Sequence, residues 1–167
     1  MEGEKHPFDC KRCDTLPKSA FKIAPVTKGW MIAYPKDSLI HIHFGRATVT
    51  EEESTTDGEW AHENICNDWY AQNPGVNFFV AADFFLEDDA EFPSNNAMAA
   101  WKKFLAHPQT DIVVCYRTTI SMKMFVSLLA KMSKTLHKLK VVGTENEMEE
   151  QYTLWLSKKT NITKTNK

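Results

Sequence analysis

Two cysteines separated by two residues, in Cys10-Lys11-Arg12-Cys13, have the spacing of a metal-binding or redox-active pair. A redox pair of this kind follows a strand and opens a helix, and no strand pattern precedes Cys10. A zinc site needs four ligands, for which His6, Asp9 and Asp14 are the neighbouring candidates. Without a second pair these residues do not define a metal site. No cofactor is expected, and Cys10, Cys13 and His6 stay candidates beside a plain polar segment or a site completed by a partner.

Two histidines, His41 and His43, alternate within the apolar run from Leu39 to Phe44. If this run is a strand, both imidazoles lie on one face, where they are a possible metal pair. The more common explanation is a solvated face of an edge strand, and this is the expectation.

One carboxylate interrupts the apolar run from Phe78 to Phe85, namely Asp83, and Arg117 follows the next apolar run, from Ile112 to Tyr116. Both lie where parallel strands end, and ligand sites of open parallel sheets lie at that edge. We expect an ion pair, and a ligand site is the alternative. The sequence has no nucleophile with an adjacent histidine, no dinucleotide fingerprint and no P-loop.

The composition is that of one soluble globular domain. The chain has 167 residues, of which 43% are hydrophobic and 25% charged. It contains no apolar run long enough to span a membrane and no secretory signal, so membrane insertion is not expected. Four cysteines, three of them widely separated, favour a reducing compartment such as the cytoplasm.

Charge is unevenly distributed behind a net value of −2. The segment 51–91 has twelve acidic and no basic residues, whereas 102–140 has eight basic residues and one acidic residue. Solubility explains such a pattern, and steering towards a charged partner is the alternative. The basic positions have no interleaved aromatic residues, which disfavours nucleic acid as a partner.

Strand and helix patterns alternate along the chain, which predicts an α/β fold with a mixed, mostly parallel sheet, an initial β-hairpin and about four flanking helices. A polar arm (1–28) precedes the α/β domain (29–157), and a polar tail (158–167) follows it. The predicted strands are 30–34, 39–44, 78–85, 112–116 and 140–143, and the predicted helices are 57–72, 94–107, 119–137 and one that begins at a capping box, Thr144 to Glu147.

This order of elements resembles that of the STAS/SpoIIAA-like family. Two of the segments that carry the resemblance are Trp30-Met31-Ile32-Ala33-Tyr34-Pro35 and Trp101-Lys102-Lys103-Phe104-Leu105-Ala106-His107-Pro108. The resemblance implies a sheet backed by helices on one main side and a regulatory role in protein–protein interaction. It also implies a phosphorylation site at Ser94, at the start of a helix. The chain has Asn95-Asn96 where the family has a small residue or Gly, and Ser94 as a simple helix cap is the preferred interpretation.

The expected function is a non-enzymatic interaction domain, either regulatory or a small subunit of a larger assembly. Its partner is another protein, and the arm docks on it through Phe8, Leu16, Phe21 and Val26. A carrier of a small molecule or lipid is a second hypothesis, which requires a cavity lined by Phe84, Phe85, Met122 and Phe125. An enzyme centred on Asp83 and Arg117 is a third.

Overall fold

A six-stranded mixed sheet forms the centre of the computed structural model, which describes residues 7–48, 50–85 and 94–165. The strands follow one another in the order β1-β2-β3-β4-β5-β6. The first three are antiparallel, and β3, β4, β5 and β6 run parallel. Their bounds are β1 Lys22–Ile23, β2 Trp30–Tyr34, β3 Leu39–His43, β4 Phe78–Asp83, β5 Thr110–Tyr116 and β6 Leu139–Val141.

The predicted α/β order and the opening hairpin are confirmed, and a short edge strand, β1, is added to them. A 3-10 turn, Pro35–Asp37, joins the two hairpin strands and ends at Ser38 in a left-handed conformation (φ 53°). The apolar run from Phe78 becomes the central strand β4, in which every residue is buried. Such a strand needs a helical layer on both faces.

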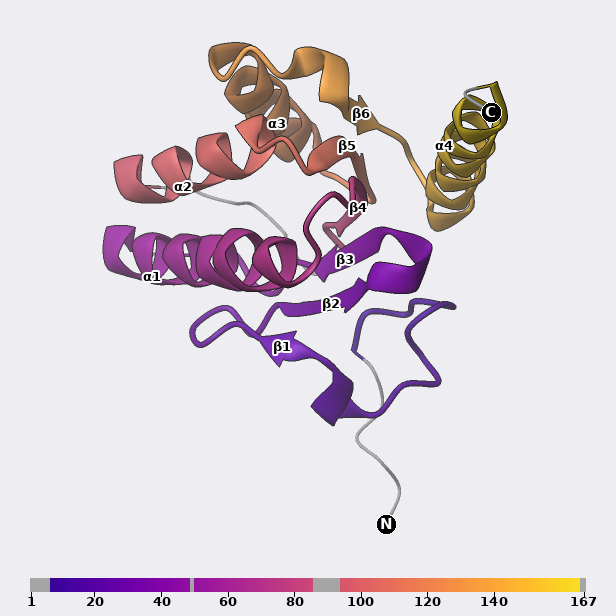
Figure 1. Ribbon diagram of the computed structural model, residues 1–167. Helices are drawn as coiled ribbons and strands as arrows, with labels where there is room; N and C mark the ends of the chain where they lie inside the picture. Colours follow the sequence, from indigo (N-terminus) through magenta and orange to yellow (C-terminus); the bar gives the residue numbers. More distant parts are fainter. Residues whose placement is uncertain (1–6, 49, 86–93, 166–167) are drawn as a thin grey trace.

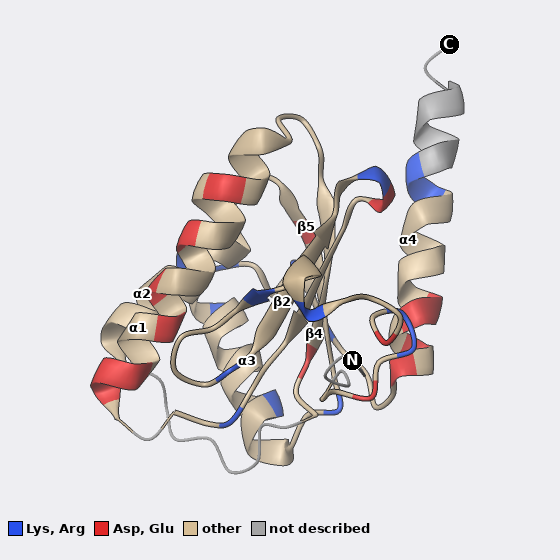
Figure 2. Ribbon diagram, turned by 90° about the horizontal axis from the view of Figure 1, so that it is seen from below, with Lys and Arg blue, Asp and Glu red and all other residues tan. Residues whose placement is uncertain are grey.

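Three helices cover one face of the sheet, as Figure 1 shows, and a fourth lies on the opposite face. The first face carries α1 (Glu51–His62), which continues as a π-helical segment, η3 (Glu63–Tyr70), and then α2 (Asn95–Ala106) and α3 (Ile120–Met132). The other face carries α4 (Glu145–Thr165), which packs on Phe79 and Tyr116 through Met148 and Tyr152. Figure 2 shows the sheet edge-on between the two layers.

Two helix bounds differ from the sequence prediction. The first helix begins at Glu51 rather than near Asp57, because the Thr50 side chain accepts a hydrogen bond from the Glu53 amide. Three glutamates in its first turn also stabilise the helix there, because their negative charges interact with the positive end of the helix dipole. The third helix ends at Met132 rather than near His137, because Lys134 takes a left-handed conformation (φ 58°) that a helix cannot continue.

The start of the last helix is confirmed. Thr144 and Glu147 form the predicted capping box, in which each side chain accepts a hydrogen bond from the other residue's amide. The helix then continues to Thr165, through most of the segment that the sequence assigns to a polar tail. Among the described residues, no helix is both long and apolar enough to cross a membrane.

The N-terminal segment is part of the folded core. Phe8 is fully buried, with its ring 4.9 Å from that of His43, and Phe21 packs 5.0 Å from the Trp30 ring. Leu16 and Val26 are half-buried, and Leu16 packs against the same cluster. The arm therefore covers β2 and β3 on the α4 side of the sheet, which corrects the expectation that its apolar side chains are presented to a partner.

Candidate metal centre

Two buried histidines lie at the centre of the face that the arm covers. His41 and His43 project from β3 on the same side, as strand geometry requires, and both are fully buried. The predicted solvated face is absent because β3 is not an edge strand. It pairs with β2 on one side and β4 on the other, and the arm closes over it.

The cysteine pair lies directly over these histidines, in a tight turn of the arm. The amides of Cys13 and Asp14 both donate to the Cys10 carbonyl, at 3.2 and 2.9 Å. The two residues between the cysteines bind α4, because the Lys11 amide donates to Glu145 at 3.0 Å and Arg12 makes two bonds to Glu149. The turn is thus fixed from outside while both thiols point inward and are fully buried.

Four potential ligand atoms meet at this place. One atom from each of Cys10, Cys13, His41 and His43 lies within 4.8 Å of the other three. His41 Nδ1 lies 3.9 Å from Cys10 Sγ and 3.5 Å from Cys13 Sγ, and His43 Nε2 lies 3.4 Å from Cys13 Sγ. Zinc bonds of about 2.3 Å to sulfur and 2.05 Å to nitrogen, at a tetrahedral angle, place these atom types about 3.6 Å apart. The spacing fits one tetrahedral ion.

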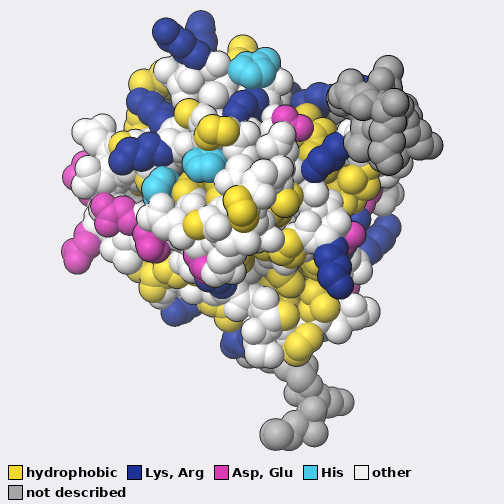
Figure 3. All heavy atoms as spheres, viewed as in Figure 1, with side chains coloured by type: hydrophobic (Ala, Val, Ile, Leu, Met, Phe, Trp, Pro, Cys, Tyr) yellow, Lys and Arg dark blue, Asp and Glu magenta, His cyan; other side chains and the backbone are white. Residues whose placement is uncertain are grey.

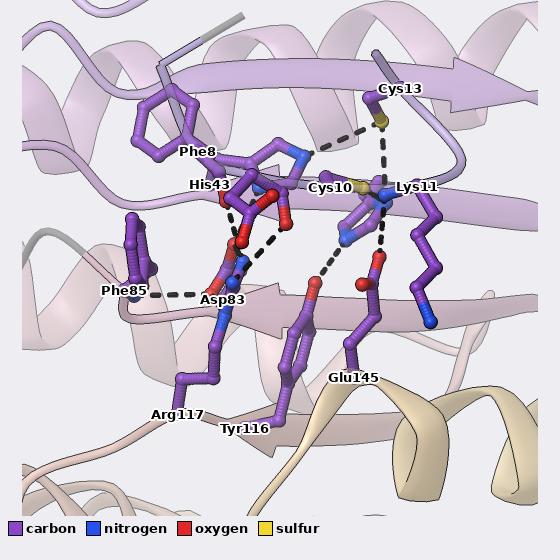
Figure 4. A network of polar contacts seen from close by, with 12 residues as sticks. Phe8, Cys10, Lys11, Cys13, His43, Asp83, Phe85, Tyr116, Arg117 and Glu145 are labelled. Carbon is purple, nitrogen blue, oxygen red and sulfur yellow. Dashed lines mark hydrogen bonds and ion pairs between the residues drawn. The ribbon is translucent and has the colours of Figure 1, made fainter.

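Each histidine presents one nitrogen to the cysteines and is held at the other. His43 Nδ1 lies 2.7 Å from Asp83 Oδ2, and His41 Nε2 lies 2.6 Å from the Tyr116 hydroxyl. Asp83 and Tyr116 reach this face because they are aligned with His43 across β4 and β5. Figure 4 shows this layer of polar contacts below the cysteine turn.

The carboxylate of Asp83 is fully engaged. Arg117 Nε donates to Oδ1 at 2.8 Å and its Nη2 donates to Oδ2, while the Phe85 amide donates to Oδ1 at 3.1 Å. The same guanidinium donates to the Phe8 carbonyl at 2.8 Å. The ion pair expected between Asp83 and Arg117 is therefore present, and it links the arm, the sheet and His43 (Figure 4).

The electrostatics favour charge separation within the cluster. Contact with Cys10, followed by contacts with His41 and His43, outweighs burial and lowers the pKa of the Cys13 thiol far below its usual value. The same contact with Cys13 raises the pKa of Cys10. Burial alone would raise the pKa of Asp83, but hydrogen bonds from His43 and Arg117 hold it below its usual value. Cys13 is therefore the more acidic of the two thiols, and a bound cation would stabilise both as thiolates.

The other predicted site residues lie elsewhere. His6 falls outside the described residues, and Asp9 and Asp14 are exposed. Ser94 is buried as the N-cap of α2, where its hydroxyl oxygen accepts from the Ala97 amide and lies 2.7 Å from Thr55 Oγ1. Its role as a cap is confirmed, and phosphorylation would require this contact between α1 and α2 to open.

The chain matches no known family model, no characterised protein and no solved structure. Its function is therefore inferred from its own geometry.

Proposed function

We propose that this chain is a zinc-binding α/β domain, in which one Zn²⁺ is held by Cys10, Cys13, His41 and His43. The observation that carries the proposal is the convergence of four ligand atoms within 4.8 Å in a fully buried place. Two thiolates and two imidazoles form a ligand set that selects zinc over magnesium or calcium, which prefer oxygen. The two thiolates also balance the charge of the ion.

The role of the ion is structural. Catalytic zinc keeps a position for water or substrate, whereas structural zinc is closed by four protein ligands. Here four side chains would occupy all four positions, and all four are buried where the arm packs on the sheet. With Nδ1 of His41 and Nε2 of His43 on the metal, the remaining ring nitrogens donate to Tyr116 and Asp83, the arrangement that orients zinc-bound histidines. The ion would fasten the arm to the sheet.

The direct test is the metal content of the purified chain, measured by native mass spectrometry. We expect one Zn²⁺ per chain, with the mass of the ion less two protons, because both thiols are deprotonated on binding. A Cys10→Ser/Cys13→Ser variant should carry no zinc. Cys66→Ser should keep its zinc, because Cys66 packs in the core on the opposite face of the sheet.

A different mass would contradict the proposal. A wild-type chain that lacks metal and is lighter than its sequence by two hydrogen atoms would indicate instead that Cys10 and Cys13 had been oxidised to a disulfide. X-ray absorption at the zinc edge provides a second reading, and it should report two sulfur and two nitrogen neighbours at about 2.3 and 2.05 Å.

The domain's wider role, we infer, is non-enzymatic protein interaction, and the surface of α3 supports this. Its apolar side chains recur every four residues on the outer side, with Ile120 82% exposed and Met124 70% exposed. Leu128 and Met132 continue the stripe and are about half exposed, as is Leu136 in the short 3-10 segment that follows α3. Monomeric proteins rarely leave such a stripe uncovered. We therefore propose α3, in preference to the N-terminal arm, as the surface that binds a partner.

Charge indicates the kind of protein that α3 would bind. Lys123 and Lys131 of α3, and Lys134 just after it, are also exposed. In the view of Figure 3, basic side chains occur among apolar ones in the upper part of the surface. An apolar surface with an acidic rim fits this pattern.

A photo-crosslinking residue at position 128 should therefore form one defined protein adduct in cells, and Lys131→Glu/Lys134→Glu should weaken it. The same residue at exposed position 153 of α4 is the control. Equal labelling at both positions, or an adduct unaffected by charge reversal, would argue against this surface.

The sequential strand order, with α1, α2 and α3 on one face, supports the proposal of a STAS/SpoIIAA-like architecture, in which helices back one main side of the sheet. Membership of that family stays a proposal. No part of the function proposed here depends on it, because the metal site and the α3 surface are argued from this chain's own residues.

A further inference from the structure

A cavity of about 140 Å³ lies between the sheet and the three helices of the first face. Its floor is formed by side chains of β2 to β5, among them Val80 and Ala82, and its walls by Trp60 of α1, Trp101 of α2 and Met122 of α3. The cavity is on the face of the sheet opposite the cysteine turn, and of the four proposed metal ligands only His43 borders it. A test of ligand binding in this cavity is therefore independent of the test for zinc.

The packing of the helices keeps this space open. A Cβ added at Gly58 of α1 would lie 3.0 Å from Ala97 of α2, so the two helices touch at their backbones. Nearby, the Ser94 amide donates to Ser54 Oγ at 2.9 Å. These contacts fix the spacing of α1 and α2, while the small side chain of Ala82 leaves the floor beneath them unfilled. Interiors are otherwise closely packed, so a space of this size is uncommon.

One end of the cavity is lined by a polar rim, which we define as Thr27, Arg46, Thr48 and Asp57. These residues are at least partly exposed, so the cavity is open to solvent at this rim. Its two charged groups already have hydrogen-bond partners within the chain. Asp57 accepts from the amides of Val26 and Thr27, and Arg46 makes two bonds to Glu53, at 3.1 and 2.9 Å.

We propose that this cavity binds a neutral apolar small molecule about the size of one substituted aromatic ring. Apolar cavities of about 150 Å³ stay dry and admit a ligand of benzene size. A charged ligand is disfavoured, because an apolar cavity penalises the burial of a charge, and Arg46 at the rim is already bound to Glu53. The carrier hypothesis from the sequence names four lining residues, and Phe84, Met122 and Phe125 do line the cavity. Phe85 instead lies outside, 44% exposed, against the Arg117 guanidinium.

Methionine methyl groups provide the readout, because Met31 and Met122 line the cavity whereas Met124 and Met132 are exposed on α3. Toluene should shift the methyl NMR signals of the first pair in a saturable way and leave the second pair unchanged. At ten times its Kd it should raise Tm by about 3 to 6 °C. Benzoate, which has a similar ring with a charge, should bind at least about tenfold more weakly.

Filling the cavity should abolish binding. Ala82→Leu places a larger side chain on the floor and should weaken toluene binding more than about tenfold. Ala99→Leu, the same substitution at an exposed site on α2, should leave it unchanged. If Ala82→Leu does not fold, Ala61→Val fills the wall by a smaller amount. Three results would each overturn the proposal: no saturable shift of the Met31 and Met122 signals, an equal shift of the Met124 signal, or an equal affinity for benzoate.

Discussion

Replacing Cys13 with serine should release the zinc ion and lower the free energy of unfolding by at least about 3 kcal/mol. Cys13 is central to the cluster, because its sulfur lies within 3.5 Å of both histidines and 3.4 Å from the Tyr34 hydroxyl. Serine is a poor zinc ligand, and loss of the ion removes the metal bonds that would offset the burial of the remaining thiol and of the metal-facing nitrogens. Urea unfolding of the two proteins, each with one equivalent of zinc, measures the difference.

The expected loss of stability depends on which part of the fold the ion would stabilise. Structural zinc contributes about 10–16 kcal/mol of apparent binding free energy in small zinc-finger peptides. This chain has a sheet and two helical layers that fold around a large core, so only part of such an energy is needed. The part that depends on zinc is the arm, whose Phe8 and Phe21 pack on β2 and β3. Amide hydrogen exchange should therefore rise first in residues 7–24.

Chelation provides the matched control. A strong chelator should reduce wild-type stability to that of Cys13→Ser and leave the variant unchanged. Cys66→Ser also exchanges a buried thiol for a hydroxyl. It should lower the free energy of unfolding by less than Cys13→Ser does, and the variant should still be destabilised by the chelator. A Cys13→Ser protein as stable as the wild type, or a wild type that is indifferent to chelator, would count against a structural ion.

Half of the metal centre can be predicted from local pattern alone. The alternation from Leu39 to Phe44 puts His41 and His43 on one face, and the structure confirms it. Parallel strands that follow one another in sequence place Asp83 and Arg117 together, and the ion pair confirms this as well. Both inferences depend only on the period of a strand and on the rule that successive parallel strands are neighbours.

The other half depends on a long-range contact that no local pattern contains. The arm has few apolar residues and no period, so the sequence does not show which face it covers. The two pairs of ligands are close in space but about thirty residues apart, and each pair alone is ambiguous. One signal could have joined them. Three consecutive strands would bury several polar groups on one face of the sheet, namely the imidazole pair, an aspartate and Tyr116. Buried polar groups need a polar or metal partner, so a segment that carries one should cover this face.

The missed helix start illustrates the same limit at short range. The segment from Glu51 to Thr56 is acidic and lacks an apolar stripe, and its sequence therefore favours a loop. Capping by Thr50 and the attraction between the three glutamates and the helix dipole outweigh that pattern. The helix then needs only its later turns, with Ala61 and Ile65, to reach the core.

Asp83→Asn should weaken zinc binding by about 10–100-fold, although Asp83 does not contact the ion. Its Oδ2 holds His43 Nδ1 at 2.7 Å, which directs Nε2 at the cysteines. Asparagine has a single acceptor oxygen and no charge, so it cannot serve both His43 and Arg117. We also expect a loss of about 3 kcal/mol in stability, since the guanidinium loses its counter-ion in a largely buried place. Competition with a chromophoric chelator measures the zinc affinity.

Arg117→Gln separates positioning from charge pairing. It removes the cation and the bond to the Phe8 carbonyl but leaves Asp83 on His43. Stability should fall, because a buried carboxylate loses its counter-ion, while zinc affinity should stay within about threefold of the wild type. If Asp83 acts only through the ion pair, the two variants will lose zinc affinity equally. If Asp83 positions His43, as the geometry requires, only Asp83→Asn will bind zinc markedly more weakly.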